Sequence, residues 1–154
     1  MIEGQEVHRF NLARCTFIIP LRIETADRMR NIITTLIYLT RNFACRIIVK
    51  EVDKESVYLR DVQPLLEQAL EPEMMNCITH IFEESDEFTF HRTKILNDML
   101  WMVKTPVVCN YDSDIILPVD SYINATNMIL KGWVHPDAEG CLLYTSDAAD
   151  DNVG

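Results

Sequence analysis

Four short apolar runs, separated by longer stretches of helical character, constrain the fold of this chain most strongly. They cover residues 15–20, 46–49, 78–82 and 107–111, and most of their residues are β-branched, aromatic or cysteine. Runs of this length and composition are typical of buried β-strands. The pattern therefore predicts a sheet whose strands are separated along the chain by other elements.

The stretches between these runs place apolar side chains on one face of a helix. Thr25 is the expected N-cap of the first helix, Pro64 the expected kink or restart of the second, and Gly132 the expected C-cap of the last. The apolar positions are Met29, Ile32, Ile33, Leu36 and Leu39; Val57, Leu59, Val62, Leu65, Leu66 and Ala69; Ile95, Leu96, Met99, Leu100 and Val103; and Tyr122, Ile123, Ile129 and Leu130. Because strands that alternate with helices need crossover connections, we expect an α/β fold with a mainly parallel sheet flanked by helices.

Composition limits the classes of function that this chain can have. The 154 residues fit one domain, and 48% hydrophobic with 25% charged residues is a globular composition. The net charge of −10 argues against nucleic acid as a general partner. No apolar run is long enough to cross a membrane and no secretory signal opens the chain, so the expected location is cytoplasmic. Five cysteines without a C-x-x-C pair favour free, buried thiols over a zinc site or a redox motif.

The last residues of the chain have an unusual sequence. Residues 141–154 resemble the conceptual translation of a sequencing adapter, and such a segment is excluded from fold reasoning. The expected organisation is therefore a lead-in over residues 1–14, a domain over 15–140 that is incomplete at its C-terminus, and a non-native tail over 141–154. A genuine polar tail is the alternative.

Polar residues follow several of the predicted strands. Arg22 and Glu24 come after the first strand, Glu51 and Asp53 end the second, and Asp112-Ser113-Asp114 follows the fourth. In open parallel sheets, ligands bind outside the carboxyl ends of the strands, so these side chains are candidates for one site. Two carboxylates spaced as in Asp112 and Asp114 can hold a divalent cation, which in turn can hold a diphosphate. The alternative is a solvated turn, since Asp and Ser favour turns.

Several common motifs are missing from the sequence. There is no G-x-G-x-x-G, no G-x-x-x-x-G-K-[ST] and no G-x-S-x-G, which disfavours dinucleotide binding, P-loop hydrolysis and serine-hydrolase chemistry. The four histidines show no spacing typical of metal ligands.

Taken together, these features resemble the nucleotide-sugar-binding half of glycosyltransferases of the GT-A fold, closest to family 2. The resemblance covers roughly residues 15–133. The segment Ile18-Ile19-Pro20-Leu21-Arg22 is similar to the opening strand of the family, in which Pro20 begins the nucleotide loop. The segment from Phe90 to Asn97 is similar to the family's helix with a cation near its start and an Asn one turn later. Asp112-Ser113-Asp114 resembles the D-x-D motif of the family.

The resemblance implies roles for the candidate residues. Asp114 would bind the metal directly, while Asp112 would contact the ribose or the metal, with Ser113 in the same nucleotide-sugar site. Arg92 would approach the diphosphate, and Asn97 would help to shape the site.

The nucleotide pocket would be completed by residues of the first two strand ends. Pro20, Arg22 and Glu24 would line it, and Glu51 would contact the base. The segment Lys50-Glu51-Val52-Asp53 departs from the family at this point, because the usual residue is Asp followed by Asp-Gly-Ser.

The implied activity is the transfer of a sugar from a nucleoside diphosphate, with a UDP-sugar as the favoured donor and Mn²⁺ or Mg²⁺ as the cofactor. The acceptor would be a saccharide or a lipid-linked molecule. The catalytic base of inverting members lies after the D-x-D strand, so it is expected downstream of this fragment, which alone would be inactive. Missing regions could also associate the whole protein with a membrane.

Three other functions stay open at this point. A haloacid-dehalogenase-like phosphotransferase also places two Asp at a strand end, but normally on the first strand and with Thr or Val where this chain has Ile116. A nucleotidyltransferase would show a Gly-rich basic loop after the first strand, unlike residues 20–23 here. The third alternative is a catalytically inactive nucleotide-sugar-binding or interaction domain.

Overall fold

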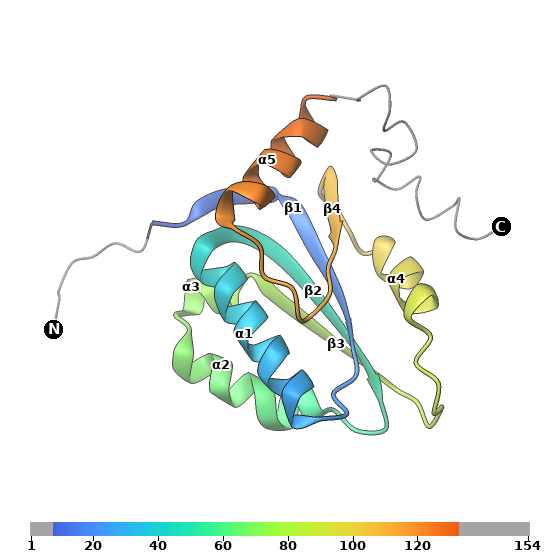
Figure 1. The fold of residues 1–154 in the computed structure, drawn as a ribbon. Helices are drawn as coiled ribbons and strands as arrows, with labels where there is room; N and C mark the ends of the chain where they lie inside the picture. Colours follow the sequence, from blue (N-terminus) through green and yellow to red (C-terminus); the bar gives the residue numbers. More distant parts are fainter. Residues whose placement is uncertain (1–7, 133–154) are drawn as a thin grey trace, which may run out of the picture.

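A parallel sheet forms the centre of the protein (Figure 1). The computed structural model describes residues 8–132. In this part of the chain the sheet has four strands in the order β3-β2-β1-β4, and every neighbouring pair is parallel. The strands are β1 (Phe10–Leu21), β2 (Phe43–Asp53), β3 (Ile78–Glu84) and β4 (Val107–Asn110). The predicted α/β class with a mainly parallel sheet flanked by helices is confirmed, and the arrangement is Rossmann-like.

The helices are α1 (Ala26–Asn42), the π-helix η1 (Tyr58–Val62), α2 (Gln63–Ala69), the one-turn α3 (Pro72–Met75), α4 (Arg92–Leu100) and α5 (Val119–Leu130). The first and last helices begin and end close to the positions that the sequence predicts, but α4 ends at Leu100, before the predicted Val103, and the one-turn α3 was not predicted. The predicted second helix is divided into a π-helix and α2. Thr25 caps α1 by accepting a hydrogen bond from the Arg28 N–H, Pro64 lies in the first turn of α2, and Gly132 follows α5 with φ of +66°. Within residues 8–132, no helix combines the length and hydrophobicity that a membrane crossing requires.

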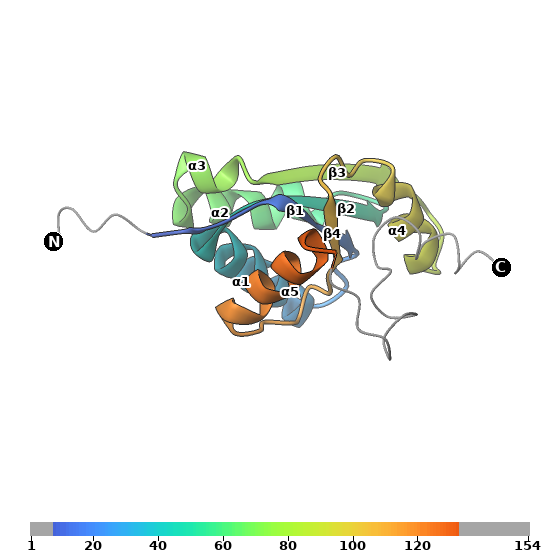
Figure 2. The same ribbon diagram turned by 90° about the horizontal axis from the view of Figure 1, so that it is seen from above.

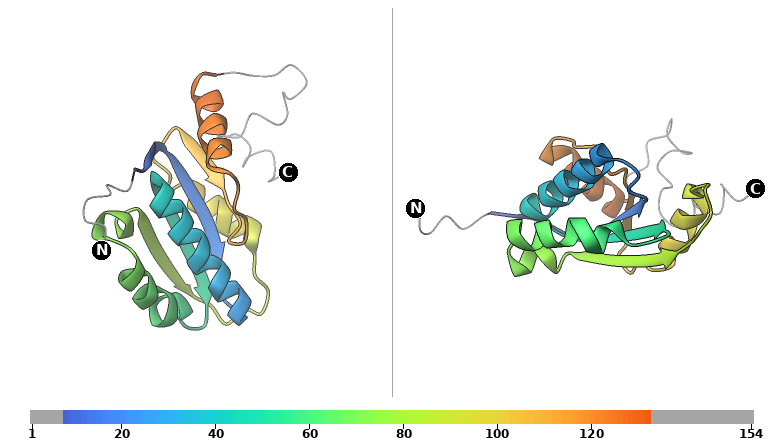
Figure 3. Two further views of the ribbon diagram at one scale, coloured as in Figure 1. Left: turned by 60° about the vertical axis from the view of Figure 1, so that its left-hand side comes forward. Right: turned by 90° about the horizontal axis from the view of Figure 1, so that it is seen from below.

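The two faces of the sheet bury separate apolar clusters. On one face, Phe17 and Ile47 pack in the same cluster as Leu36 of α1, Leu66 of α2 and Tyr122 of α5. On the other face, side chains of β1 and β2 pack against Ile95, Leu96 and Met99 of α4. Figures 2 and 3 show α1 and α5 together on the first face. This division follows from the alternation of side chains along each strand.

The first strand is longer than the sequence predicts. It begins at Phe10, and Phe10 pairs with Phe43 before the register shifts between Asn11 and Thr16. The sequence predicts a lead-in here because the composition of residues 10–14 is mixed. In the structure most of their side chains are exposed, and only Leu12 is buried among them. Backbone pairing with β2, rather than burial, makes this segment a strand. The tail over residues 141–154 lies outside the described residues.

Candidate functional site

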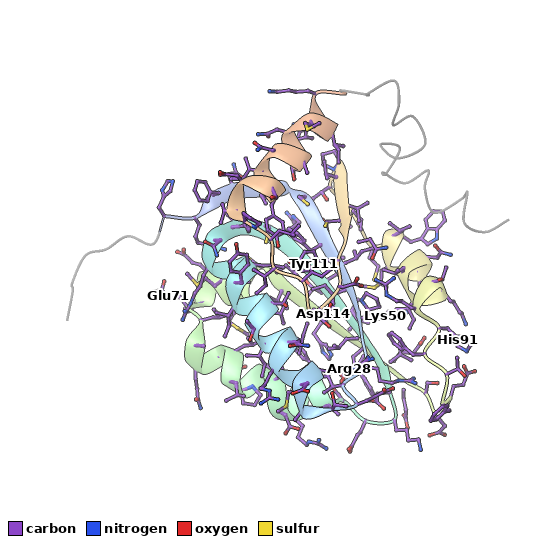
Figure 4. The ribbon with its side chains drawn as sticks, viewed as in Figure 1. Arg28, Lys50, Glu71, His91, Tyr111 and Asp114 are labelled. Carbon is purple, nitrogen blue, oxygen red and sulfur yellow. The ribbon has the colours of Figure 1, made fainter. Side chains whose placement is uncertain are left out.

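A cleft of about 430 Å³ lies where β1 and β4 end. The strand order reverses between β1 and β4, because β2 and β3 extend the sheet on the opposite side of β1. Ligands of open α/β sheets bind at such a point, outside the carboxyl ends of the strands. Arg28 extends from α1 and Asp114 follows β4, and both line this cleft (Figure 4). The residues lining the cleft are Pro20, Leu21, Arg22, Arg28, Asn31, Phe90, Arg92, Asp112, Ser113 and Asp114.

Buried aromatic rings and hydroxyl groups fix the position of the loop that carries Asp112 and Asp114. Tyr111 packs edge-on against Phe17, with ring centroids 5.4 Å apart, and its hydroxyl hydrogen-bonds to that of Tyr122 at 2.6 Å. The Thr35 hydroxyl on α1 donates to the Ser113 carbonyl oxygen at 2.6 Å. Anchored in this way, the loop leaves the side chains of the flanking Asp112 and Asp114 exposed.

Arg92 faces the aspartate loop from the first turn of α4. Its guanidinium forms an ion pair with Asp112 and lies 3.4 Å from the Asn110 side-chain oxygen. Both partners of the ion pair are about half exposed, at 44% and 50% of their side-chain surface. A pair with this exposure is worth little to stability, so an incoming ligand can replace it at small cost.

We therefore expect the Arg92→Gln variant to lose less than about 1 kcal/mol of unfolding free energy. The reason is that water solvates the Asp112 carboxylate when the arginine is removed. Urea unfolding followed by circular dichroism measures this change. A larger loss of unfolding free energy would show that the main role of Arg92 is to stabilise the fold rather than to line the mouth of the cleft.

Arg22 lines the cleft, but its guanidinium is used within the protein. The side chain is buried, and its Nε donates to the Val52 carbonyl oxygen at 2.8 Å. Its Nη1 donates to the carbonyl oxygens of Glu87 and Phe88 at 3.1 and 3.0 Å, and the guanidinium lies 5.3 Å from the centre of the Phe90 ring. Arg22 thus ties the end of β2 to the loop before α4, and in this way it shapes the wall of the cleft.

Glu51 also has its polar contacts within the protein. Its carboxylate is fully buried and accepts hydrogen bonds from the Ser56 hydroxyl at 2.6 Å and the Tyr58 N–H at 3.0 Å, and it lies 3.1 Å from His80 Nε2. His80 in turn stacks on Tyr58, with ring centroids 4.0 Å apart. Burial raises the pKa of Glu51, but the hydrogen bonds from His80, Ser56 and Tyr58 outweigh it, so the pKa lies below its usual value. In this geometry Glu51 secures the connection after β2 and does not line the cleft.

The other predicted residues divide into two groups. Pro20, Arg92, Asp112, Ser113 and Asp114 come together in the cleft. The strand-end rule predicts this for the aspartate loop, and the family resemblance implies it for Pro20 and Arg92. Glu24 is exposed after β1, and Asn97 lies in the second turn of α4; neither lines the cleft.

Two polar cleft residues were not among the predicted ones. Arg28 and Asn31 are exposed on α1, three positions apart, and both face the cleft. Side chains at this spacing share one face of a helix. Their position in the sequence could have predicted them. Because α1 follows β1 directly, the first turns of α1 must lie beside the end of that strand. With Arg22 and Arg92, Arg28 brings the cationic residues of the cleft to three, opposite two aspartates.

The aspartate pair fits a cation that arrives together with a phosphate ligand. Within residues 8–132, no group of three or more His, Cys, Asp or Glu side chains is placed to hold a metal ion. Mg²⁺ in phosphate-transfer sites is usually held by one or two carboxylates together with substrate phosphates and water. Asp112 and Asp114 can provide such a partial set of ligands, although Asp112 must first exchange its ion pair with Arg92.

The cleft is polar and contains both arginines and a pair of carboxylates. Such a cleft could bind an anionic ligand through the arginines and an accompanying cation through the carboxylates. The cleft lies at the usual binding position of an open α/β sheet, and its basic side chains are guanidinium groups, which bind phosphate oxygens through paired hydrogen bonds. No protein-family model and no curated protein matches this chain.

Proposed function

We propose that this chain is the nucleotide-sugar-binding part of a metal-dependent glycosyltransferase of the GT-A type, similar to family 2. One observation carries the proposal: the Asp112-Ser113-Asp114 loop and Arg92 meet at the strand-order reversal, in one cleft with Pro20. This is where an open α/β sheet binds a nucleotide. The favoured donor is a UDP-sugar, and the favoured cofactor is Mn²⁺ or Mg²⁺.

Each cleft residue has a distinct task in this proposal. Asp114, which is exposed and forms no ion pair within residues 8–132, would hold the cation, and Asp112 would join it or bind the ribose after leaving Arg92. The bound cation supplies Lewis acidity that stabilises negative charge on the departing diphosphate. Arg92, once released from Asp112, would donate charge-assisted hydrogen bonds to the phosphate oxygens. Arg28 would add a second cation from α1.

Two predicted ligand contacts have a weaker geometric basis. Glu51 is fully buried and hydrogen-bonded, so it can reach a nucleobase only if its contacts with Ser56 and Tyr58 break. The Nε and Nη1 groups of Arg22 donate to three carbonyl oxygens, so its main task is to position the loop before Arg92. No residue of the cleft is assigned as the base that activates an acceptor.

Calorimetric titration of the protein with UDP, in the presence and absence of Mn²⁺, tests this proposal. We expect Mn²⁺ to strengthen UDP binding at least about tenfold, because the cation joins the diphosphate to Asp114. The Asp114→Asn variant should lose this metal-dependent gain. The matched control is Asp120→Asn, which removes an exposed carboxylate that does not line the cleft and should bind like the wild-type protein.

Other outcomes would favour the alternative functions. Metal-dependent binding that persists in Asp112→Asn and Asp114→Asn would contradict a site at this loop and favour an interaction domain. A phosphoryl group trapped on Asp112 would favour a phosphotransferase instead.

A further inference from the structure

A second cluster of reactive side chains lies at the amino ends of the strands, away from the cleft. It consists of Arg9, which precedes β1, Cys45 on β2, and Cys77, which immediately precedes β3. Cys45 is buried, whereas Cys77 is partly exposed. The three residues are far apart in sequence, and pairing of the strands brings them together.

Arg9 is fixed against the Cys77 sulfur. Its Nε donates to the Thr40 carbonyl oxygen at 2.8 Å and its Nη2 to the Phe43 carbonyl oxygen at 2.9 Å. The same Nη2 lies 3.0 Å from Cys77 Sγ. A guanidinium held in place beside a sulfur atom stabilises the thiolate form of the cysteine.

Further donors surround the same sulfur. The Cys45 thiol, and then its backbone N–H and Arg9, place the pKa of Cys77 below its usual range, although burial acts in the opposite direction. One contact favours the protonated thiol, because the Glu73 carbonyl oxygen lies 3.7 Å from Cys77 Sγ. This contact is longer than the one with Arg9.

The other described cysteines have a different environment. Burial raises the pKa of Cys15 to about 11 and that of Cys109 to about 12. Neither lies beside a cationic side chain in residues 8–132. Cys109 is partly exposed like Cys77, so it is the natural reference for reactivity.

The strand register places Cys45 and Cys77 within reach of each other. Ile47 pairs with Ile78, and the Ile47 N–H donates to the Cys77 carbonyl oxygen at 2.8 Å. Cys77 and Cys45 thus lie one and two residues before this pair on neighbouring strands. With the usual strand spacing and rise, their Cα atoms are separated by roughly 6 Å, a distance that a disulfide can span. A regular pleat would turn the two side chains to opposite faces, but Cys77 lies in the turn before β3, where the pleat does not fix the direction of its side chain. The Cys45 thiol is close enough to lower the pKa of Cys77.

We propose that Cys77 is a peroxide-sensitive thiolate and that Cys45 is its resolving partner. The Cys77 thiolate attacks one oxygen of hydrogen peroxide, the O–O bond breaks, and hydroxide leaves as a sulfenic acid forms on Cys77. The Cys45 thiol then attacks the Cys77 sulfur. The S–O bond breaks, the hydroxyl departs as water with the Cys45 proton, and a Cys45–Cys77 disulfide forms. Two electrons pass from the thiols to the peroxide.

Residue-resolved alkylation tests the first part of the proposal. The folded protein is treated with iodoacetamide over a range of pH, and each cysteine is read by peptide mass spectrometry. We expect Cys77 to react at least about tenfold faster than Cys109 at pH 7, because the thiolate form is stabilised at Cys77 and not at Cys109. The Arg9→Gln variant should slow Cys77 severalfold and shift its reaction midpoint to higher pH. Arg9→Lys, which keeps the charge, should restore part of the rate.

Oxidation with hydrogen peroxide tests the second part. The wild-type protein should form the Cys45–Cys77 disulfide within one molecule, and dithiothreitol should reverse it. Cys45→Ser should instead accumulate the Cys77 sulfenic acid, which a dimedone probe traps. Cys109→Ser is the matched control and should oxidise like the wild-type protein. Equal alkylation of Cys77 and Cys109, or the absence of both the disulfide and the trapped sulfenic acid, would overturn the proposal.

Discussion

The Glu51→Leu variant is expected to unfold with a free energy about 3 kcal/mol below that of the wild-type protein. Leucine fills a similar volume, but it leaves the Ser56 hydroxyl, the Tyr58 N–H and His80 without their shared acceptor. A buried donor that loses its partner costs free energy because water cannot replace that partner. Urea unfolding at pH 7, followed by circular dichroism, measures the loss.

Glu51→Gln is the matched control, and it should lose only about 1 kcal/mol. The amide keeps an acceptor oxygen, and both the Ser56 hydroxyl and a neutral His80 ring can reverse their roles as donor or acceptor. A leucine variant as stable as the wild-type protein would contradict a structural role for Glu51. In that case, the better explanation for the buried Glu51 carboxylate would be that it binds a ligand.

The pH dependence of stability provides a further check on Glu51. Its pKa in the folded protein lies below the ordinary value of 4.5, so the carboxylate stabilises the fold fully above that pH. The contribution is lost as the pH falls below 4.5 and through the folded-state pKa. The stability advantage of the wild-type protein over Glu51→Gln should therefore shrink as the pH falls below 4.5.

Arg22→Met is expected to cost about 2–3 kcal/mol, because the methionine cannot donate to the three carbonyl oxygens that Arg22 now satisfies. Arg22→Lys should recover only part of this loss, since an ammonium group cannot reproduce the planar fork of a guanidinium. The loop before α4 would lose its anchor, so UDP binding in the cleft should weaken as well. Thermal unfolding and calorimetry measure the two effects.

Arg28→Met is the control for this experiment. Arg28 lies in the same cleft but is exposed, so its loss should change stability by no more than about 0.5 kcal/mol. Under the proposed function, this variant should still weaken UDP binding. If Arg22→Met were as stable as Arg28→Met, the contacts of Arg22 would contribute nothing to the fold, and its main role would be in the cleft.

The elements of the fold were predictable wherever burial alone determines them. The core of each strand is short and apolar because both faces of a parallel sheet are covered, as the burial of Phe17, Ile18 and Ile19 on β1 illustrates. The start of β1 was not predictable in this way. Phe10 and Asn11 are exposed and join the sheet through backbone pairing, which leaves little trace in composition.

The candidate site was predictable in part. The strand-end rule identified Asp112 and Asp114, because the carboxyl ends of parallel strands must meet at one edge. Arg92, at the start of α4, was a candidate through the family resemblance. It could not show that Glu51, also at a strand end, is buried against Ser56 and Tyr58. Side-chain direction depends on packing partners that are distant in sequence.

The sequence by itself determined the alternating order of the strands and main helices, the start of α1 after Thr25, the end of α5 before Gly132, and the aspartate loop after the fourth strand. These follow from local periodicity, capping residues and turn chemistry, which act over a few neighbouring residues. Only the tertiary structure decided that Arg22 anchors a loop, that Arg28 faces the cleft, and that Arg9 and Cys45 meet Cys77. Such contacts depend on strand order and register, which bring together side chains that no local pattern connects.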